Sequence, residues 1–138
     1  MNHVTLLHHM TTLLTGIRVG RHESYDRVVL DFTGTAPTFT HDPTDELIAD
    51  PSGEVDWLTG CAFVQVNAHG AAAHNDAGES TYPGPRKFRT RELANVMAVS
   101  LNGDFEGVVG VGLGLRRSAS VTVFTLTSPT RLVIDVQH

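Results

Sequence analysis

Short runs in which apolar and polar residues alternate constrain the fold of this chain most strongly. The clearest are Arg27–Phe32 (RVVLDF) and Arg131–Val136 (RLVIDV), which share one formula: an arginine, three aliphatic residues, an aspartate and an apolar residue. Successive side chains of a strand point to opposite faces of the sheet. Each run therefore presents a wholly apolar face and an Arg-Val-Asp face, which predicts two amphipathic strands.

The charged residues of these two runs predict how the strands pair. Within one run the arginine and the aspartate are four positions apart, about 13 Å along a strand, which is too far for direct contact. If the runs lie side by side and antiparallel, Arg27 falls near Asp135, and Asp31 falls near Arg131. The charges are then solvated surface groups of framework strands. A binding face or a set of catalytic carboxylates is the alternative interpretation.

Five further segments have the composition of strands, and turn-forming residues separate them. They are residues 13–19, 58–66, 94–101, 106–115 and 121–126. Turns that recur about every 8 to 12 positions are typical of a β-sandwich or barrel, and Asn102–Gly103 predicts one hairpin turn. A chain of 138 residues that is 41% hydrophobic suits one core. We therefore expect a single-domain, all-β sandwich of about seven to eight short strands.

Glycine alternates with aliphatic residues in Gly107–Gly114 (GVVGVGLG). The run does not complete a GxGxxG fingerprint, and it lacks the Lys-Ser/Thr of a nucleotide-binding P-loop. Glycines on one face of a strand instead indicate that another part of the molecule packs closely against the backbone there.

Two long segments interrupt the strand pattern. Residues 42–57 are acidic, contain two prolines and read as a loop. Residues 67–87 are small, polar and rich in Gly and Pro, without any periodicity, so we expect a long, mobile loop. Residues 1–11 read either as a helix or as a flexible leader, which leaves residues 12–138 as the sandwich domain.

Composition excludes several classes of protein. The formal net charge is −5, which argues against a nucleic-acid partner. Cys61 is the only cysteine, so the sequence excludes an intrachain disulfide and a cysteine-based zinc site; we expect a small buried side chain there. No apolar run is long enough to span a membrane. No signal peptide is visible, so the protein is either cytoplasmic or extracytoplasmic with its export signal removed.

No motif predicts catalysis, a metal or a cofactor. Eight histidines are present, but none has the HExxH spacing of a zinc site, and no serine lies in a GxSxG elbow. The candidate ligand-binding residues are basic groups in predicted turns, which suit an anionic ligand such as a cell-wall polymer. They are Arg18, Arg21, His22, Arg116 and Arg117. Solubilising turn charges are the alternative interpretation.

An ordered set of short segments resembles the AMIN-like domain of actinobacterial secreted proteins and lipoproteins, itself similar to the AMIN domain of cell-wall amidases. The segments are residues 15–22 (TGIRVGRH), 25–32 (YDRVVLDF), 58–66 (LTGCAFVQV), 103–109 (GDFEGVV), 112–115 (GLGL), 123–126 (VFTL) and 129–136 (PTRLVIDV). The resemblance covers roughly residues 12 to 137. It implies a non-catalytic β-sandwich that acts in the cell envelope by binding peptidoglycan or an envelope protein. The sequence departs from the family pattern in having no lipobox cysteine.

The leading expectation is therefore an extracytoplasmic binding or localisation domain. Two rival functions remain open. One is a small hydrolase whose site lies in residues 67–87 and uses His69, His74 and Asp76. The other is a structural protein that forms a homodimer or larger homo-oligomer through an exposed sheet edge.

Overall fold

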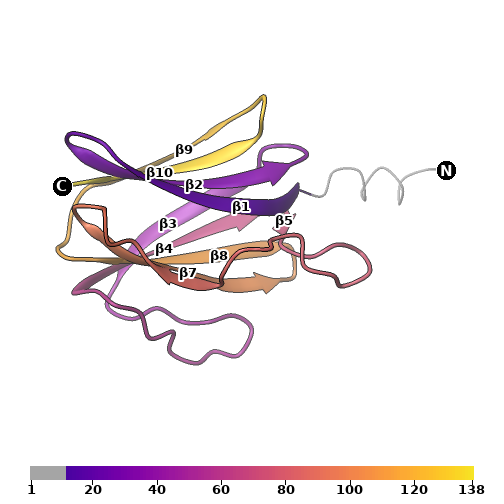
Figure 1. Cartoon of the computed structure of the whole chain (residues 1–138). Helices are drawn as coiled ribbons and strands as arrows, with labels where there is room; N and C mark the ends of the chain where they lie inside the picture. Colours follow the sequence, from indigo (N-terminus) through magenta and orange to yellow (C-terminus); the bar gives the residue numbers. More distant parts are fainter. Residues whose placement is uncertain (1–11) are drawn as a thin grey trace.

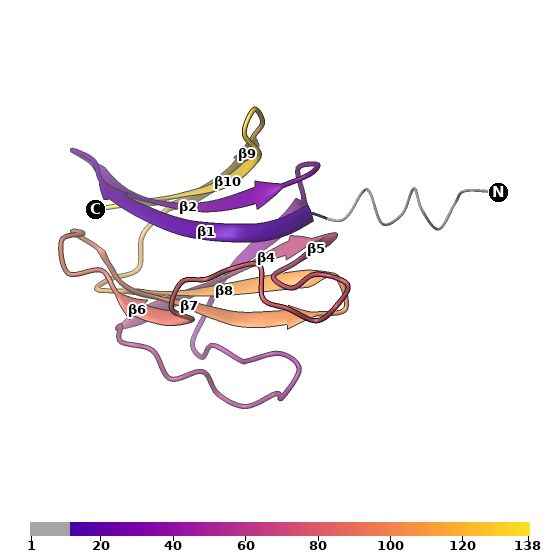
Figure 2. The same ribbon diagram turned by 45° about the vertical axis from the view of Figure 1, so that its right-hand side comes forward.

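The computed structural model describes residues 12–138, which form ten strands in two five-stranded sheets and contain no helix (Figure 1). The two sheets lie face to face as the layers of a sandwich, which the rotated view also shows (Figure 2). The predicted all-β sandwich is therefore confirmed, with ten strands instead of seven or eight. The predicted leader, residues 1–11, lies outside the described residues.

Sheet A has the strand order β5-β1-β2-β10-β9, and its neighbours are antiparallel except for β1 and β5. Its strands are β1 (Thr12–Arg21), β2 (Tyr25–Thr33), β5 (Ala71–Ala72), β9 (Val121–Leu126) and β10 (Arg131–Gln137). Sheet B has the order β3-β4-β8-β7-β6 and is antiparallel throughout. Its strands are β3 (Thr38–Thr44), β4 (Ala62–His69), β6 (Lys87–Arg89), β7 (Val96–Phe105) and β8 (Val108–Leu115).

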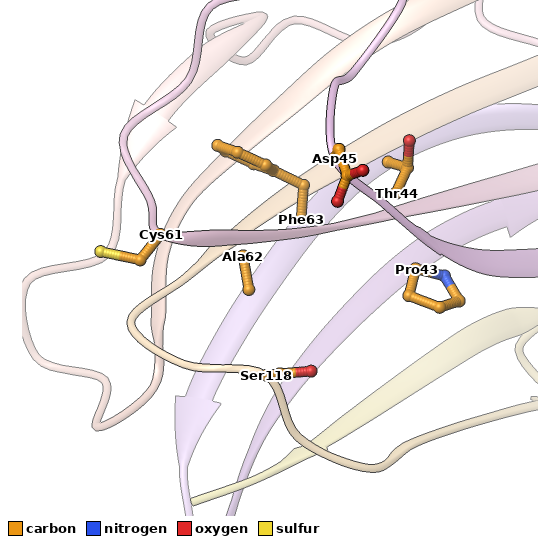
Figure 3. Close-up of a pocket in the computed structure, with 7 residues that line it drawn as sticks. All are labelled: Pro43, Thr44, Asp45, Cys61, Ala62, Phe63 and Ser118. Carbon is orange, nitrogen blue, oxygen red and sulfur yellow. The ribbon is translucent and has the colours of Figure 1, made fainter.

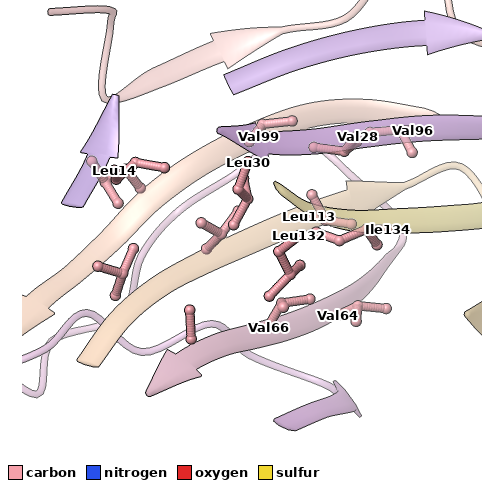
Figure 4. Packing of buried hydrophobic residues seen from close by; sticks show 14 of the residues in the cluster. Leu14, Val28, Leu30, Val64, Val66, Val96, Val99, Leu113, Leu132 and Ile134 are labelled. Carbon is pink, nitrogen blue, oxygen red and sulfur yellow. The ribbon is translucent and has the colours of Figure 1, made fainter. Parts of the chain in front are cut away.

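The core lies between the sheets and is built from the apolar face of each alternating strand (Figure 4). Fully buried aliphatic residues come from both layers: Val28, Leu30, Leu132 and Ile134 from sheet A, and Val66, Val99, Val111 and Leu113 from sheet B. Burying one such side chain contributes about 1.5–3 kcal/mol. A slip of one residue would expose a whole face of a strand, so this burial fixes the register of each pair.

The two repeated runs are antiparallel neighbours, because β2 lies between β1 and β10. The register places Arg27 opposite Asp135 and Asp31 opposite Arg131. Arg27 donates two hydrogen bonds to Asp135, at 2.8 Å from Nε to Oδ1 and 2.9 Å from Nη2 to Oδ2. The predicted pairing of the runs and the first predicted ion pair are confirmed.

The second predicted ion pair is wrong. Asp31 accepts hydrogen bonds from Arg18 of β1, at 2.7 Å from Nε and 2.9 Å from Nη2. The guanidinium of Arg131 instead donates to the carbonyl of Pro129 at 2.7 Å. Asp31 has strands on both sides, and the residue opposite it on β1 is Gly16, whose missing side chain leaves room for the Arg18 side chain.

We expect measurable coupling between Arg27 and Asp135 in a double-mutant cycle of the two alanine variants. The pair is bidentate and partly buried, with side-chain exposures of 31% and 14%. The expected coupling energy is about 1 kcal/mol, at the upper end for cross-strand charge pairs. Urea denaturation measures it, and the matched control is the cycle on Arg131 and Asp31. Equal coupling in both cycles would contradict the assignment.

The glycine-rich strand is β8, and the segment 45–60 packs against its glycine face (Figures 1 and 2). A Cβ atom on Gly114 would overlap the carbonyl group of Thr59. A Cβ atom on Gly112 would lie 2.7 Å from Cδ1 of Leu47, which is itself buried. The predicted close packing against the glycines is confirmed: Leu47 of the acidic segment covers Gly112, and the residues that follow this segment cover Gly114.

The hairpin turn predicted at Asn102–Gly103 is wrong. Both residues lie inside β7, and the turn into β8 is made by Glu106–Gly107, with φ angles of 51° and 78°. Positive φ at both central residues suits the twist of a tight hairpin. The register between β7 and β8 shifts beside Asn102, which marks a β-bulge, and the carbonyl of Asn102 accepts the backbone N–H of Asp50 at 2.9 Å. The pattern therefore marked a bulge and not a turn.

The predicted loop 67–87 is shorter than expected and contributes to the core. β4 continues to His69, and β5 pairs in parallel with the start of β1. Ala71, Ala73 and Tyr82 are buried in the main hydrophobic cluster. Alanines in so short a segment leave no periodic signal, although their small size lets this segment close one edge of the sandwich.

Candidate functional site

Four of the five predicted ligand-binding residues come together at one end of the sandwich. We call Arg21, His22, Arg116 and Arg117 the basic end. Arg21 is opposite Asp26 in the β1–β2 ladder, and the carboxylate of Asp26 accepts the backbone N–H of Asn95 at 2.6 Å. Asn95 in turn accepts the backbone N–H groups of Arg116, at 2.8 Å, and of Arg117, at 3.1 Å.

The residue that organises the basic end is Asp26, whose side chain is fully buried. Its carboxylate accepts three backbone N–H groups, from Ala94 at 3.1 Å, Asn95 at 2.6 Å and Val96 at 2.9 Å. His138 Nε2 lies 2.9 Å from Oδ1 of Asp26. Burial acts to raise the pKa of Asp26, but the backbone hydrogen bonds and His138 outweigh it, so its pKa is lowered.

The cations of the basic end are exposed and lack carboxylate partners. Arg21, Arg116 and Arg117 form no ion pair within residues 12–138, although Glu23 follows in the same turn. The guanidinium of Arg116 donates only to the carbonyl of Ala94, at 3.1 Å. Guanidinium groups that are not neutralised by the protein are suited to hold carboxylates or phosphates of a ligand.

His22 and Arg18, two of the predicted residues, each contact a neighbouring side chain. The ring of His22 is stacked on Tyr25, with centroids 4.6 Å apart. Arg18 does not belong to the basic end, since it lies on the outer face of sheet A and its charge is neutralised by Asp31. Sequence reasoning grouped Arg18 with Arg21 because only three positions separate them, but the strand carries them to different surroundings.

A second candidate surface was missed by the sequence analysis. It is a pocket of about 320 Å³ on the outer face of sheet B, near the end that holds Thr12. Three side-chain amides line it together with an acid, a histidine and an exposed isoleucine. We call the set Gln65, Asn67, Asn102, Asp50, His69 and Ile48 the amide cleft.

The amides of this cleft hold each other in place. Asn102 Nδ2 donates to Gln65 Oε1 at 2.9 Å, and Gln65 Nε2 donates back to Asn102 Oδ1 at 3.0 Å. Gln65 Nε2 also donates to Asn67 Oδ1 at 3.0 Å. Gly110 lies directly beneath them, because its Cβ atom would lie 2.9 Å from Asn102 Oδ1. The glycines of β8 thus leave room for the side chains of the amide cleft as well as for the segment 45–60.

The amide network continues into an ion pair between a buried aspartate, Asp56, and an exposed lysine, Lys87. Asn102 Nδ2 donates to Asp56 Oδ2 at 3.2 Å, and Asp56 pairs with Lys87 at 2.8 Å. Burial acts to raise the pKa of Asp56, but hydrogen bonds from Lys87, Ser100 and Asn102 outweigh it and lower this pKa. The sequence signal for this cleft was weak. It consisted of the polar residues Gln65 and Asn67, at alternate positions of one strand, together with the glycine-rich strand that pairs with it.

Cys61 is exposed, so the expected buried thiol is wrong. It lies just before β4, where its backbone N–H donates to Leu115, and it lines a pocket of about 650 Å³ (Figure 3). Its sulfur points away from Asp45 in this view, and no histidine is among the described residues that line the pocket.

The residues of the rival hydrolase hypothesis have separate partners. His74 Nδ1 lies 2.7 Å from Asp104 Oδ2, and Asp104 Oδ1 accepts the backbone N–H of Ala73 at 2.8 Å. His69 Nε2 lies 3.3 Å from the hydroxyl of Thr40. Within the described chain, no group of three or more His, Cys, Asp or Glu residues is placed to hold a metal ion.

Comparison with known proteins identifies the family. The AMIN-like domain model matches residues 12–138, as the resemblance of the sequence predicted. No curated protein and no solved structure matches the chain significantly. Residues 12–138 contain no helix of the length and hydropathy that a membrane crossing requires. The match spans essentially the whole described chain, and the chain therefore belongs to the AMIN-like domain family.

Proposed function

We propose that this AMIN-like domain is a non-catalytic binding and localisation domain of the cell envelope, and that its ligand is peptidoglycan. Family membership supports an envelope-related domain. An envelope protein is the alternative partner. The proposal includes an extracytoplasmic location, which fractionation of cells that express the full-length protein would test.

The observation that carries the proposal is the basic end. Its arginines come from distant parts of the sequence, yet one buried aspartate and one asparagine fix both turns beside each other. Within residues 12–138 these arginines form no ion pair with a carboxylate, although the chain has a formal net charge of −5. Peptidoglycan presents the carboxylates of its peptide stems, and a guanidinium binds a carboxylate through two parallel hydrogen bonds.

We expect the domain to sediment with purified, protease-treated peptidoglycan at low salt. The Arg116→Ala/Arg117→Ala variant should bind about tenfold more weakly, because each exposed guanidinium contact contributes up to about 1 kcal/mol. Retention should also fall between about 50 mM and 500 mM NaCl, since salt screens exposed charges. Quantifying the bound fraction over a range of peptidoglycan concentrations gives the apparent affinity.

The matched control is Arg86→Ala/Arg131→Ala, which removes the same charge elsewhere on the surface. Equal weakening in both double variants would show only a general charge effect and contradict the assignment to the basic end. Retention on untreated envelopes but not on protease-treated peptidoglycan would favour the protein partner. Pairing of two copies through a sheet edge stays a prediction, for which the uncharged edge strand β9 is the natural candidate.

A further inference from the structure

The amide cleft combines hydrogen-bond donors and acceptors that the fold leaves available. Asn67 uses its Oδ1 to accept from Gln65, whereas its Nδ2 donates to no group within the described residues. The side-chain carboxylate of Asp50 likewise has no partner there. The remaining amides, Gln65 and Asn102, bind each other and keep the cleft in one conformation.

The composition of the cleft selects a class of ligand. No lysine or arginine is among the described residues that line it, and the carboxylate of Asp50 repels anions, so carboxylate and phosphate ligands do not fit. One carboxylate alone is a poor cation site, because hard cations take several oxygen ligands. A hydroxyl group both donates and accepts, so a pair of neighbouring hydroxyls matches the acceptor of Asp50 and the donor of Asn67.

The shape of the cleft also suits a sugar ring. Its floor is formed by the side-chain amides that lie over the backbone of Gly110, so a ligand in the cleft would meet a polar surface. Ile48, with 46% of its surface exposed, provides an apolar wall for the C–H face of a ring or for an acetyl methyl group. The volume of about 320 Å³ is at the small end of ligand pockets.

We propose that the amide cleft is a binding subsite for a neutral pyranoside with neighbouring hydroxyl groups. Resting on the proposed function, the natural occupant is the N-acetylhexosamine at the non-reducing end of a glycan strand, because its 3- and 4-hydroxyl groups are free neighbours, whereas inside the strand the 4-oxygen is in the glycosidic bond. The subsite is separate from the basic end, since the two lie towards opposite ends of β8, roughly 20 Å apart along the strand. The basic end then binds the charged peptide stems, and the cleft binds the sugar.

The test is an NMR titration of the ¹⁵N-labelled domain with N,N′-diacetylchitobiose, a soluble and uncharged probe. We expect saturable shifts confined to the backbone amides around the cleft, such as those of Asn102, Gly103 and Gly110. Asn67→Asp should weaken binding about tenfold, because it removes a hydrogen-bond donor to the ligand. Asp50→Asn should weaken binding by a smaller factor, because a neutral amide oxygen accepts a weaker hydrogen bond than a carboxylate. Both substitutions keep the size of the side chain. Asn67→Asp also keeps the oxygen that accepts from Gln65.

The matched control is Asp45→Asn, which changes an exposed acid that lines the pocket beside Cys61. This variant should bind chitobiose with unchanged affinity. Affinity should also be insensitive to salt and to Arg116→Ala/Arg117→Ala. No shifts, shifts outside the cleft, or equal affinities for all variants would overturn the subsite. If the domain sediments with peptidoglycan through the basic end but does not bind chitobiose, the proposed function is supported and the sugar subsite is rejected. Chitobiose binding without sedimentation would keep the subsite and reject peptidoglycan retention.

Discussion

Asp26→Ala is expected to destabilise the domain by about 4 kcal/mol. The substitution leaves the backbone N–H groups of Ala94, Asn95 and Val96 without their acceptor, and those of Asn95 and Val96 are in buried hydrogen bonds. Each buried donor that loses its partner costs about 1–3 kcal/mol. Urea denaturation monitored by circular dichroism measures the loss, which corresponds to a fall in Tm of about 10–20 °C.

Asp31→Ala is the matched control, because it removes an aspartate of the same sheet whose partner, Arg18, is exposed. Its effect should remain below about 1 kcal/mol. Asp26→Asn should fall between the two, since the amide keeps one acceptor oxygen and the shape of the side chain. A loss in Asp26→Ala no larger than that in Asp31→Ala would contradict the role assigned to the buried carboxylate.

The same carboxylate gives the stability a dependence on pH. The pKa of Asp26 is lower in the folded state than its ordinary value of 3.8. A carboxylate with a lowered folded-state pKa contributes stability that is complete above its unfolded-state pKa and is lost as pH falls through the folded-state pKa. The wild type should therefore lose stability below about pH 4 more steeply than Asp26→Asn, with Asp56 contributing in the same direction.

Gly114→Ala is expected to destabilise the domain by about 3 kcal/mol or to prevent folding. The added methyl group would overlap the carbonyl of Thr59 and meet the backbone of Gly60, and neither can rotate away. Overpacking of this kind usually costs about 1–3 kcal/mol. Replacing glycine by alanine inside a strand without such a neighbour stabilises by about 0.5–1 kcal/mol, so the sign of the effect is diagnostic.

Two other glycines calibrate this prediction. The Cβ atom of Gly20→Ala would have only His22 within reach, at 4.0 Å, so this substitution should stabilise the domain by about 0.5–1 kcal/mol. Gly112→Ala would meet the flexible side chain of Leu47 at 2.7 Å, and we expect an intermediate loss. The order Gly20, Gly112, Gly114 in urea denaturation is the expected result, and equal stability of Gly114→Ala and the wild type would contradict it.

The sequence predicted the strands in which apolar and polar residues alternate clearly. It failed where burial or backbone geometry depends on contacts between distant segments. In the runs around Val28–Leu30 and Leu132–Ile134 the alternating aliphatic residues face the core as predicted, and the two runs pair antiparallel, although the valine between them in each run is buried as well. Ala71 and Tyr82 were placed in a loop, because burial there depends on closing an edge of the sandwich and leaves no local pattern. Asn102 was placed in a turn, because its preference for tight turns is shared by bulges.

The candidate sites were predictable only in part for a related reason. Basic residues in turns are visible one by one, but their convergence depends on Asp26 and Asn95, which look unremarkable in the sequence. The amide cleft needs the register of β4, β8 and β7, because its reciprocal pair, Gln65 and Asn102, is separated by 37 positions. A site of this kind exists only once the sheet is assembled.

The position of the basic end has a consequence for any protein that carries this domain on a tether. Thr12 begins β1 at one end of the sandwich, and Arg21 ends the same strand at the other, about 30 Å away. A linker joined ahead of Thr12 would therefore hold the arginines facing away from its anchor. The basic end of such a domain would lie farther from the anchoring surface than the linker alone allows, by about the length of the sandwich.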